Sequence, residues 1–587
     1  MAVTGNTEFM DDAISPSNER PTHEMYEWEK NQQPWLISYE RYNICSTINM
    51  PNQQTSLIDM LEAGFAKHAR QVAYYCDDQE ITYAQLDKLS LKVATYLQQL
   101  GLKVGDAIGV MLPNILQYPV ITLGVIRAGM VLVSMNPSYT SRELEHQMDD
   151  ADIKALFILD KFIYTYKDIA DNLNRDLHHL IICRLGDLKS KLKGALINLV
   201  SATTDLPPKG NWIYFSQLLA GASKAYQRPN LTLSNIVLIQ YTGGTTGTAK
   251  GAMLSHGNVI ANLLQIDALI RSAYDEEGQE DIILASLPLY HVFSFTICCV
   301  FILYRGFASR LVPNPRDINE LVNTLRRTPP HFILGVNTLF SALIQHPEFR
   351  RLDFSQLKAT IGGGMAILPS VAKKWHTITG LPIIEGYGLS ETAPVITFNP
   401  LTIAEFTNKV GLPTPATDII LLDNNDQPVR IGERGEIAVK GPQVMVGYRN
   451  LPVETANAFT ATGYLRTGDI GIIDERGFIK IVDRKKDMIV VSGFNVYPNE
   501  IESVMLEHAD VLECVAIGVP SATRGEEPKI FVVRKHNRVT AEQLLAFGKQ
   551  HLSGYKRPRY VEFVDSLPKS NVGKILRKEL RKREGLE

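Results

Sequence analysis

The chain has 587 residues, which is too many for a single hydrophobic core, so at least two domains are expected. Hydrophobic residues make up 45% of the chain and charged residues 21%, which is typical of a soluble globular protein. The net charge of −3 argues against a general nucleic-acid-binding surface. The six cysteines form no CxxC pair, so we expect reduced core thiols in a cytoplasmic protein.

The N-terminal segment, residues 1–49, is expected to be a loose arm. It has no basic stretch followed by an apolar core, so it does not have the pattern of a secretory signal. The most apolar run, residues 292–304, is shorter than the roughly 20 residues that a membrane-spanning helix needs. We therefore expect this run to form a buried helix.

The first clear elements follow within residues 81–135. A helix is expected between the capping-box pair Thr82 and Gln85 and a stop at Gly101. Its predicted apolar face comprises Leu86, Leu89, Val93, Leu97 and Leu100. The runs 107–112 and 130–135 are predicted strands, with a helix from about residue 114 to 128 between them. Strand–helix–strand order with short connections indicates a parallel α/β sheet.

The segment YTGGTTGTAKG, residues 241–251, combines glycines, threonines and one lysine after an apolar run. Backbone N–H groups and hydroxyls in such a loop can bind phosphate. The glycine and lysine spacing differs from a Walker A loop, and the Gly573–Lys574 pair lacks the other Walker A residues, so a P-loop kinase is disfavoured. A structural turn between a strand and a helix is the alternative.

After about residue 418 the pattern changes to short strands separated by turns, over residues 418–423, 435–441 and 477–484. Two segments here and one just before carry candidate chemistry. EGYGLSETAP combines an aromatic ring, flexible backbone and a carboxylate, GYLRTGDIG holds Asp469 in a turn, and PKSNVGKILRKEL places Lys574 after a glycine. Each is weak alone, because an aspartate in a turn is commonly an Asx-turn and Lys574 could be a solvated cation.

Together and in this order, these segments resemble the adenylate-forming superfamily, which includes acyl-CoA synthetases, luciferases and peptide-synthetase adenylation domains. The resemblance runs from about residue 50 to the end of the sequence and is closest to bacterial long-chain fatty-acid–CoA ligases. The segments that carry this finer match are YTGGTTGTAKGAMLSH, LPLYHVF, GVNTLF, EGYGLSETAP, GYLRTGDIG, IVDRKKDMIVVSGFNVYPNEIE and LPKSNVGKILRKEL.

The resemblance implies an α/β fold. A large N-terminal domain, residues 50–483, would contain parallel α/β subdomains and a small β-barrel-like part. A hinge at 484–486, with Lys486 as the pivot, would connect it to a small mobile α+β domain at 487–587. An exposed turn after a strand is the alternative to a hinge.

The resemblance also implies the chemistry. A fatty-acid carboxylate would attack ATP to give acyl-adenylate and pyrophosphate, and the thiol of coenzyme A would then displace AMP. Each substrate supplies its own nucleophile, so the protein orients the reactants and stabilises charge. ATP, Mg²⁺ and coenzyme A are the implied cofactors and co-substrates. An acyl-AMP ligase, an aryl or medium-chain acid–CoA ligase and a nucleotide-binding scaffold are the alternatives.

Site residues follow from the same resemblance. The phosphate loop would comprise Thr242, Gly243, Gly244, Thr245, Thr246, Gly247, Thr248 and Lys250. The adenine side would be lined by Gly362, Gly363, Gly364, Glu385, Gly386, Tyr387 and Gly388, with Tyr387 stacked on the base. Asp469 and Arg484 would bind the ribose, and Gly493 would serve the thioester step.

Four residues would act at the reacting groups. Ser390 would contact the α-phosphate, at a position where the family often has threonine, and Glu391 would hold Mg²⁺. Lys574 would bridge the carboxylate and the phosphate oxygens. His291 would lie near the acyl carboxylate, unless it is a core histidine bonded to backbone. The runs 292–304 and 333–340 would line an acyl tunnel, with ordinary core packing as the alternative.

Residues 187–201 predict a contact with the membrane. An apolar helix face is expected from Leu188, Leu192, Ala195, Leu196 and Leu199, flanked by Lys189, Lys191 and Lys193. A basic amphipathic helix can lie in a lipid interface, so we expect peripheral association with the cytoplasmic face of the inner membrane. Packing of this face on the main domain is the alternative. A homodimer is compatible with the sequence.

Overall fold

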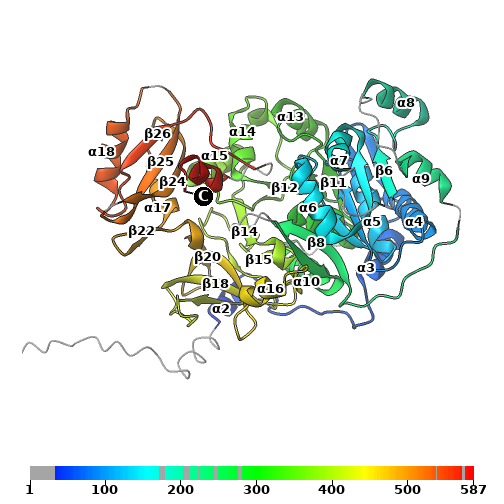
Figure 1. The fold of residues 1–587 in the computed structure, drawn as a ribbon, viewed down its shortest axis with the longest axis horizontal. Helices are drawn as coiled ribbons and strands as arrows, with labels where there is room; N and C mark the ends of the chain where they lie inside the picture. The colour runs from blue at the N-terminus through cyan, green and yellow to red at the C-terminus, as the bar shows by residue number, and fades with distance from the viewer. Residues whose placement is uncertain are drawn as a thin grey trace, which may run out of the picture.

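The structure is a computed structural model, and it describes residues 33–170, 177, 179–201, 211–222, 224–242, 249–274, 280–521, 523–536, 538–570 and 575–586. The described residues form two large sheets with helices packed on them, a small antiparallel sheet and a C-terminal lobe set to one side (Figure 1). The expected α/β fold is therefore confirmed. Residues 243–248 of the phosphate loop, and Lys574, lie outside the described ranges.

The first large sheet contains the predicted strand–helix–strand unit. Its strands lie in the order β19 (Gly447–Tyr448), β9 (Lys250–Ser255), β8 (Ile236–Thr242), β4 (Val131–Ser134), β3 (Ala107–Met111), β5 (Ile153–Leu159), β6 (His179–Cys183) and β7 (Trp212–Tyr214). Strand β3 pairs in parallel with β4 and with β5, as the sequence predicted. The flanking helices include α6 (Ser141–Ala151), α7 (Ile163–Ala170), α8 (Lys191–Val200) and α9 (Phe215–Gly221).

The predicted helices of this unit are present. Helix α4 (Tyr83–Gln99) begins at the capping box of Thr82 and Gln85. Helix α5 (Gln117–Arg127) begins about three residues later than expected. The reason is that Asn114 is engaged elsewhere: its side-chain amide donates to the backbone carbonyls of Ala285 and Leu287, at 2.9 and 2.8 Å.

The second large sheet reverses its strand order at one point. Its order is β16 (Leu412–Pro413), β15 (Val395–Phe398), β14 (Ile383–Gly388), β13 (Ala359–Gly362), β12 (Phe332–Gly335), β10 (Ile282–Ala285), β11 (Ala308–Leu311), β1 (Val72–Cys76) and β2 (Gln79–Thr82). Strand β10 pairs in parallel with β11 on one side and with β12 on the other. Open α/β sheets bind ligands beyond the carboxyl ends of strands at such a switch point.

Helices cover the second sheet. They are α3 (Leu57–Lys67), α10 (His256–Arg271), α13 (Ile318–Arg327), α14 (Asn337–Gln345) and α15 (Pro369–Thr379). The apolar run at 292–304 is buried, as predicted, but it is not one regular helix: it forms α11 (Val292–Phe295), the π-helix η2 (Thr296–Phe301) and α12 (Ile302–Arg305). In the part of the chain that is described, no helix has the length and apolar character needed to cross a bilayer.

The predicted short strands form a small antiparallel sheet, which corresponds to the expected β-barrel-like part. Its order is β17 (Asp418–Leu422), β18 (Arg434–Lys440), β20 (Leu465–Ile473) and β21 (Ile479–Arg484). Helix α16 (Pro452–Ala458) packs on β20. The short 3-10 turn η5 (Lys485–Asp487) follows β21 and leads to the C-terminal lobe.

The C-terminal lobe has one sheet and three helices among its described residues. The sheet contains β23 (Phe494–Val496), β22 (Ile489–Val491), β25 (Gly525–Arg534), β24 (Val511–Ser521) and β26 (Tyr560–Phe563). Helices α17 (Pro498–Met505) and α19 (Arg577–Arg583) contact β24, and α18 (Ala541–His551) contacts α17. The domain boundaries expected at residues 483 and 487 stay a prediction.

Two expectations about the N-terminal region and the thiols are wrong in part. Residues 33–49 do not form a loose arm, because α2 (Trp35–Arg41) buries Trp35 and Tyr39 and the Tyr39 hydroxyl donates to the carbonyl of Pro413. These two aromatic side chains supply the apolar surface that holds the segment in place. Cys45 is exposed, whereas the other five cysteines are buried as free thiols.

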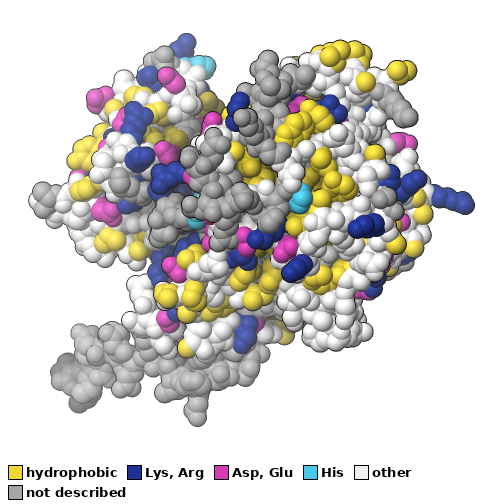
Figure 2. Space-filling model, turned by 45° about the vertical axis from the view of Figure 1, so that its right-hand side comes forward, with side chains coloured by type: hydrophobic (Ala, Val, Ile, Leu, Met, Phe, Trp, Pro, Cys, Tyr) yellow, Lys and Arg dark blue, Asp and Glu magenta, His cyan; other side chains and the backbone are white. Residues whose placement is uncertain are grey.

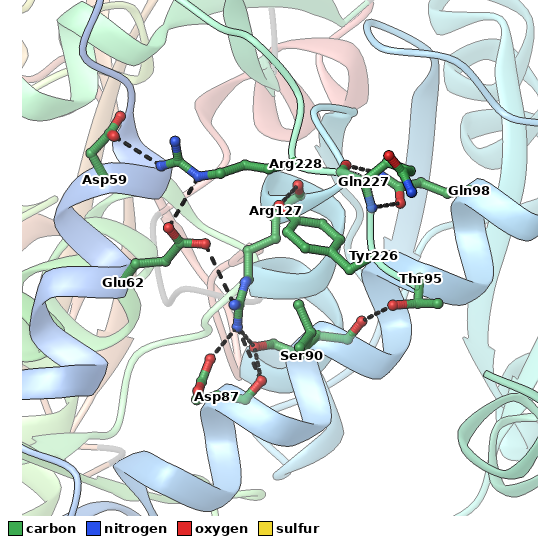
Figure 3. A network of polar contacts seen from close by, with 11 residues as sticks. Asp59, Glu62, Asp87, Ser90, Thr95, Gln98, Arg127, Tyr226, Gln227 and Arg228 are labelled. Carbon is green, nitrogen blue, oxygen red and sulfur yellow. Dashed lines mark hydrogen bonds and ion pairs between the residues drawn. The ribbon is translucent and has the colours of Figure 1, made fainter. Parts of the chain in front are cut away.

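A buried arginine ties several helices of the large domain together (Figure 3). Arg127, at the end of α5, is 4% exposed, and its guanidinium lies 2.5 Å from Asp87 of α4 and 3.5 Å from Glu62 of α3. Arg228 extends this network at the surface, at 3.1 Å from Glu62 and 2.8 Å from Asp59. The network joins α3, α4, α5 and the segment that precedes β8.

Candidate active site

A cleft of about 2340 Å³ lies between the large domain and the C-terminal lobe. It brings together most of the predicted site residues that the structure describes: Thr242, Lys250, His291, Gly363, Gly364, Glu385, Gly386, Tyr387, Gly388, Ser390, Glu391, Asp469, Arg484 and Lys486. The lobe contributes Ser570 and Ile575, which flank the segment of Lys574 in the sequence. Residues from both domains therefore face one cleft.

Two predicted residues do not line this cleft. Gly362 ends β13, directly before Gly363, and a Cβ there would lie 2.9 Å from Ile367. Gly493 lies in the turn between β22 and β23, next to Phe494, which is 57% exposed. In this arrangement of the two domains Gly493 is separate from the other site residues, and its part in the thioester step stays a prediction.

The Gly/Thr loop connects two antiparallel strands. Thr242 ends β8 and pairs with Lys250, the first residue of β9, and the Thr242 hydroxyl donates to the Lys250 carbonyl at 3.5 Å. The alternative of a turn between a strand and a helix is therefore wrong. The ammonium group of Lys250 lies 5.3 Å from the ring centroid of Tyr448, on the cleft side.

Glu391 has a partner that the sequence did not reveal. Ser390 and Glu391 begin the 3-10 turn η4 (Ser390–Thr392), and the hydroxyl of Tyr448 donates to Glu391 Oε1 at 2.9 Å. Burial raises the pKa of the Glu391 carboxyl. Burial, with the nearby Glu391 carboxylate, also raises the pKa of the Tyr448 phenol, so Tyr448 remains a donor. No motif in the sequence marks Tyr448, because its role depends on β19 pairing with β9.

Asp469 is held from two sides. Tyr387 donates its hydroxyl to Asp469 Oδ2 at 2.6 Å, and Arg484 Nε lies 3.2 Å from Oδ1. Asp469 and Arg484 are cross-strand partners on β20 and β21, which fixes their separation. Burial and the Asp469 charge raise the pKa of the Tyr387 phenol well above its ordinary value. A carboxylate has about four lone-pair sites, so Asp469 can still accept from a ribose hydroxyl.

The floor of the cleft holds a buried acid and a capping histidine. Glu385 is 6% exposed and accepts from the Ile367 N–H at 3.1 Å, and burial raises its pKa to about 7. His291 caps the N-terminus of α11, where its Nδ1 accepts from the Phe293 N–H at 3.4 Å. It also lines the cleft. The sequence analysis treated a backbone-bonded histidine and a histidine at the site as alternatives. His291 both bonds to backbone and lines the cleft.

Backbone geometry explains why glycine occupies two positions at the site. A Cβ on Gly388 would lie 1.9 Å from the Pro394 carbonyl oxygen, so no larger residue fits at the end of β14. Gly364 has a φ of 74°, a conformation that side chains other than glycine rarely adopt. The backbone at the predicted adenine side therefore depends on these residues.

An apolar part of the same cleft lies deeper in the large domain. It is lined by Ile266, Leu269, Ile270, Ile283, Phe293, Ile297, Phe301, Phe307, Phe332 and Leu334. Both runs that were expected to line an acyl tunnel, 292–304 and 333–340, contribute to it. The cleft thus has a polar lining that includes Glu391 and Asp469 and an apolar lining formed by these core side chains.

A second polar cluster joins the hinge segment to the lobe. Arg577 NH2 lies 2.7 Å from Glu502 and 2.8 Å from Asn499, and NH1 lies 3.6 Å from Asp487. The Asn499 N–H donates to Asp483 at 2.8 Å. Burial raises the pKa of Asp483 to about 7, although the charge of Arg577 acts in the opposite direction.

The acidic residues of the cleft fit a metal site that substrate phosphates and water would complete. Within the described residues, no three His, Cys, Asp or Glu side chains are grouped so that they could hold a metal ion by themselves. Mg²⁺ commonly uses one or two carboxylates together with substrate phosphates and water. Glu391 could supply one carboxylate to an ion that arrives with a nucleotide.

The fold is that of an α/β protein with a large N-terminal part and a smaller C-terminal lobe, and the cleft between them has polar and apolar walls. Residues 61–449 match the AMP-binding enzyme family, and residues 500–574 match the AMP-binding enzyme C-terminal domain. The chain therefore belongs to the AMP-binding enzyme family.

Sequence identity to named relatives and superposition on a solved structure support this assignment. The chain is 46% identical to the long-chain-fatty-acid–CoA ligase of Escherichia coli O157:H7 over 553 residues, which cover 93% of this chain and 97% of the relative. It is 35% identical to the Bacillus subtilis ligase of the same name, covering 94% and 99% of the two chains. The crystal structure of ATP-bound MatB from Rhodopseudomonas palustris superposes with a TM-score of 0.78 at 28% identity, covering 91% of this chain and all of that one.

Proposed function

We propose that the protein joins a long-chain fatty acid to coenzyme A in an ATP-dependent reaction through an acyl-adenylate. The observation that carries this function is the lining of the cleft, which combines polar residues such as Glu391 and Asp469 with a set of apolar side chains from the core. A substrate with a carboxylate head and a long hydrocarbon tail matches that combination. The similarity to named long-chain-fatty-acid–CoA ligases supports the same substrate class.

The reaction has two steps. In the first, a carboxylate oxygen attacks the α-phosphorus of ATP, and the bond to pyrophosphate breaks. Lys250 and Lys574 would offset the negative charge that builds up, and Ser390 would donate to the α-phosphate. Glu391 would hold Mg²⁺, which neutralises phosphate charge when it is bound. In the second step the thiol of coenzyme A loses its proton and attacks the acyl carbonyl, and AMP leaves.

The substrate proposal is tested with a panel of carboxylic acids. The purified protein should release pyrophosphate and form a CoA thioester with long-chain fatty acids. Pyrophosphate without thioester would indicate an acyl-AMP ligase, and a preference for aryl or medium-chain acids would indicate a related CoA ligase. A protein that releases pyrophosphate with none of these acids would be a nucleotide-binding scaffold.

Lys574 is proposed to serve only the first step. We expect Lys574→Ala to abolish adenylate formation but to convert supplied acyl-adenylate and coenzyme A to product. Lys569→Ala is the matched control, because Lys569 pairs with Glu513 on the same lobe. Equal slowing of both steps by Lys574→Ala would contradict the assignment. Lys486→Pro at the hinge should impair the change of domain arrangement, and the thioester step most strongly.

The proposed setting is the cytoplasm, with peripheral contact at the inner membrane. Long-chain fatty acids partition into bilayers, so an enzyme that binds one there reaches its substrate at high local concentration. Cell fractionation tests this point, because the protein should be divided between the soluble and membrane fractions. A homodimer is tested by light scattering of the purified protein.

A further inference from the structure

Helix α8 carries its large apolar side chains on the outside of the molecule. Leu192, Leu196, Leu199 and Val200 are 88%, 61%, 76% and 80% exposed. The helix projects at the upper right of Figure 1, and Figure 2 shows hydrophobic side chains gathered at the corresponding edge. The part of the predicted face on α8 therefore does not pack on the main domain, whereas Leu188, which precedes the helix, is half-buried against the core of that domain.

The inward side of α8 includes the buried Gly194 and the half-buried Ile197 and Asn198. A Cβ on Gly194 would lie 2.4 Å from the carbonyl oxygen of Gly186, so helix and loop are in backbone contact. The Asn198 side chain accepts from the Gly186 N–H at 2.7 Å and donates to Asp187 at 3.2 Å. A helix on a water-soluble surface usually buries its apolar stripe, and α8 has the opposite orientation.

Lys189 and Lys193, two of the lysines beside this face, have acidic partners. Lys189 lies 3.4 Å from Asp77 and 3.7 Å from Asp78, and Lys193 also pairs with Asp78. These carboxylates reduce the positive charge that would attract anionic lipids. The electrostatic part of the expected contact is therefore weak, and the apolar part remains.

We propose that the outer face of α8, formed by Leu192, Leu196, Leu199 and Val200, inserts into the interface of a lipid bilayer. An apolar helix face lying at the boundary between headgroups and acyl chains is a stable arrangement. A second copy of the chain fits less well, because a stable dimer buries about 800 Å² on each partner and one ten-residue helix offers much less. The proposal rests on the proposed function in one respect: a fatty-acid substrate dissolved in the bilayer is the reason why binding there would be useful.

Flotation of the full-length protein with phosphatidylcholine vesicles tests the inserted face. Leu192→Glu/Leu199→Glu places two charges in it, and Ile37→Glu/Val453→Glu places two charges at aliphatic side chains that are 71% and 66% exposed elsewhere. The α8 variant should lower the partition coefficient at least about tenfold, because apolar transfer drives insertion, and the control variant should not. Raising the salt concentration should change binding by less than about twofold.

Each other outcome overturns the assignment and leaves the function separately testable. If the wild type floats and the α8 variant floats equally well, the membrane contact lies on another surface. If the wild type does not float but forms long-chain acyl-CoA from micellar substrate, the membrane proposal fails and the ligase function stands. If the two glutamates instead abolish a concentration-dependent dimer, the partner is a second copy. Both variants should keep wild-type ligase activity with acid in solution.

Discussion

Two arginines with multiple acidic partners, Arg127 and Arg577, occupy different kinds of place in this molecule. Arg127 connects α3, α4 and α5 inside one core, and its partners Glu62 and Asp87 do not line the cleft (Figure 3). Arg577 lies in the C-terminal lobe and faces Glu502 and Asp487, the residue directly after the predicted hinge, and all three line the cleft.

Clusters of one arginine with several carboxylates therefore occur in two different structural settings. An arginine enclosed by elements of one domain contributes to the stability of that domain. An arginine that lies beside the predicted hinge and lines the cleft is expected to influence the arrangement of the two domains. We infer that the first affects folding and the second affects the reaction, and each of the following experiments separates the two.

The largest effect on stability is expected for Arg127→Met. The change leaves Asp87 and Glu62 without their cation, but these side chains are 43% and 32% exposed and can be hydrated, so we expect a loss of about 1–3 kcal/mol. Urea denaturation should show this loss in the transition of the large domain. A loss below about 1 kcal/mol would mean that water replaces the arginine and that the network is not structural.

Arg577→Met should reverse this pattern. We expect the overall ligase rate to fall more than about tenfold, because the segment that begins three residues before Arg577 and includes Lys574 loses its link to the hinge. The unfolding transition of the large domain should not move. A matched decrease in that transition would place Arg577 with Arg127 as a residue of the fold.

The pH dependence of the free energy of unfolding should also distinguish the Arg577 cluster from the Arg127 network. Asp483 has a folded-state pKa of about 7, above its ordinary value, so its contribution to stability is greatest below the unfolded pKa and is lost as pH rises through 7. The stability difference between wild type and Asp483→Asn should therefore decrease by up to about 3 kcal/mol between pH 4 and pH 8. Calorimetry across this range measures it, and a constant difference would contradict the assignment.

Asp59, in the Arg127 network, should respond in the opposite sense. Burial raises its pKa, but hydrogen bonds from Arg228 and Ser56 outweigh burial and hold the pKa below its ordinary value. Its contribution is present above the unfolded pKa and is lost as pH falls through the folded one.

The smallest effect is expected for Arg228→Met. This side chain is 47% exposed, and exposed ion pairs contribute less than about 1 kcal/mol. Urea denaturation at low and high salt should show a small loss that high salt removes. A loss as large as that of Arg127→Met would show that the two arginines act as one unit.

The sequence predicted the parts of the fold that depend on local patterns. The capping box at Thr82, the parallel pairing of β3 with β4 and the antiparallel strands after residue 418 all follow from nearby residues. The start of α5 did not, because Asn114 bonds to carbonyls about 170 residues away in the chain. Most described site residues share one cleft, as the motifs and the family resemblance led us to expect.

The contacts that the sequence did not predict are tertiary. Tyr448 reaches Glu391 only because β19 adds to the edge of a sheet, and Arg577 reaches Asp487 only when the lobe packs on the hinge. The sequence also did not predict the orientation of α8. An apolar stripe predicts a helix face, but it does not predict whether that face is buried. In each case the deciding information is the position of a distant backbone segment.

The π-helical stretch η2 offers a route by which substrate range can diverge. A π-helical turn holds about one residue more than an α-helical turn, so it has the form of a single-residue insertion. Ile297 and Phe301, which line the apolar part of the cleft, both lie within it. Deleting one residue between 296 and 301 is expected to restore regular helix and to change which side chains face the apolar part of the cleft, while α12 keeps its place. Under the proposed function, the gain or loss of one codon here would change which acyl chains the apolar part of the cleft accepts.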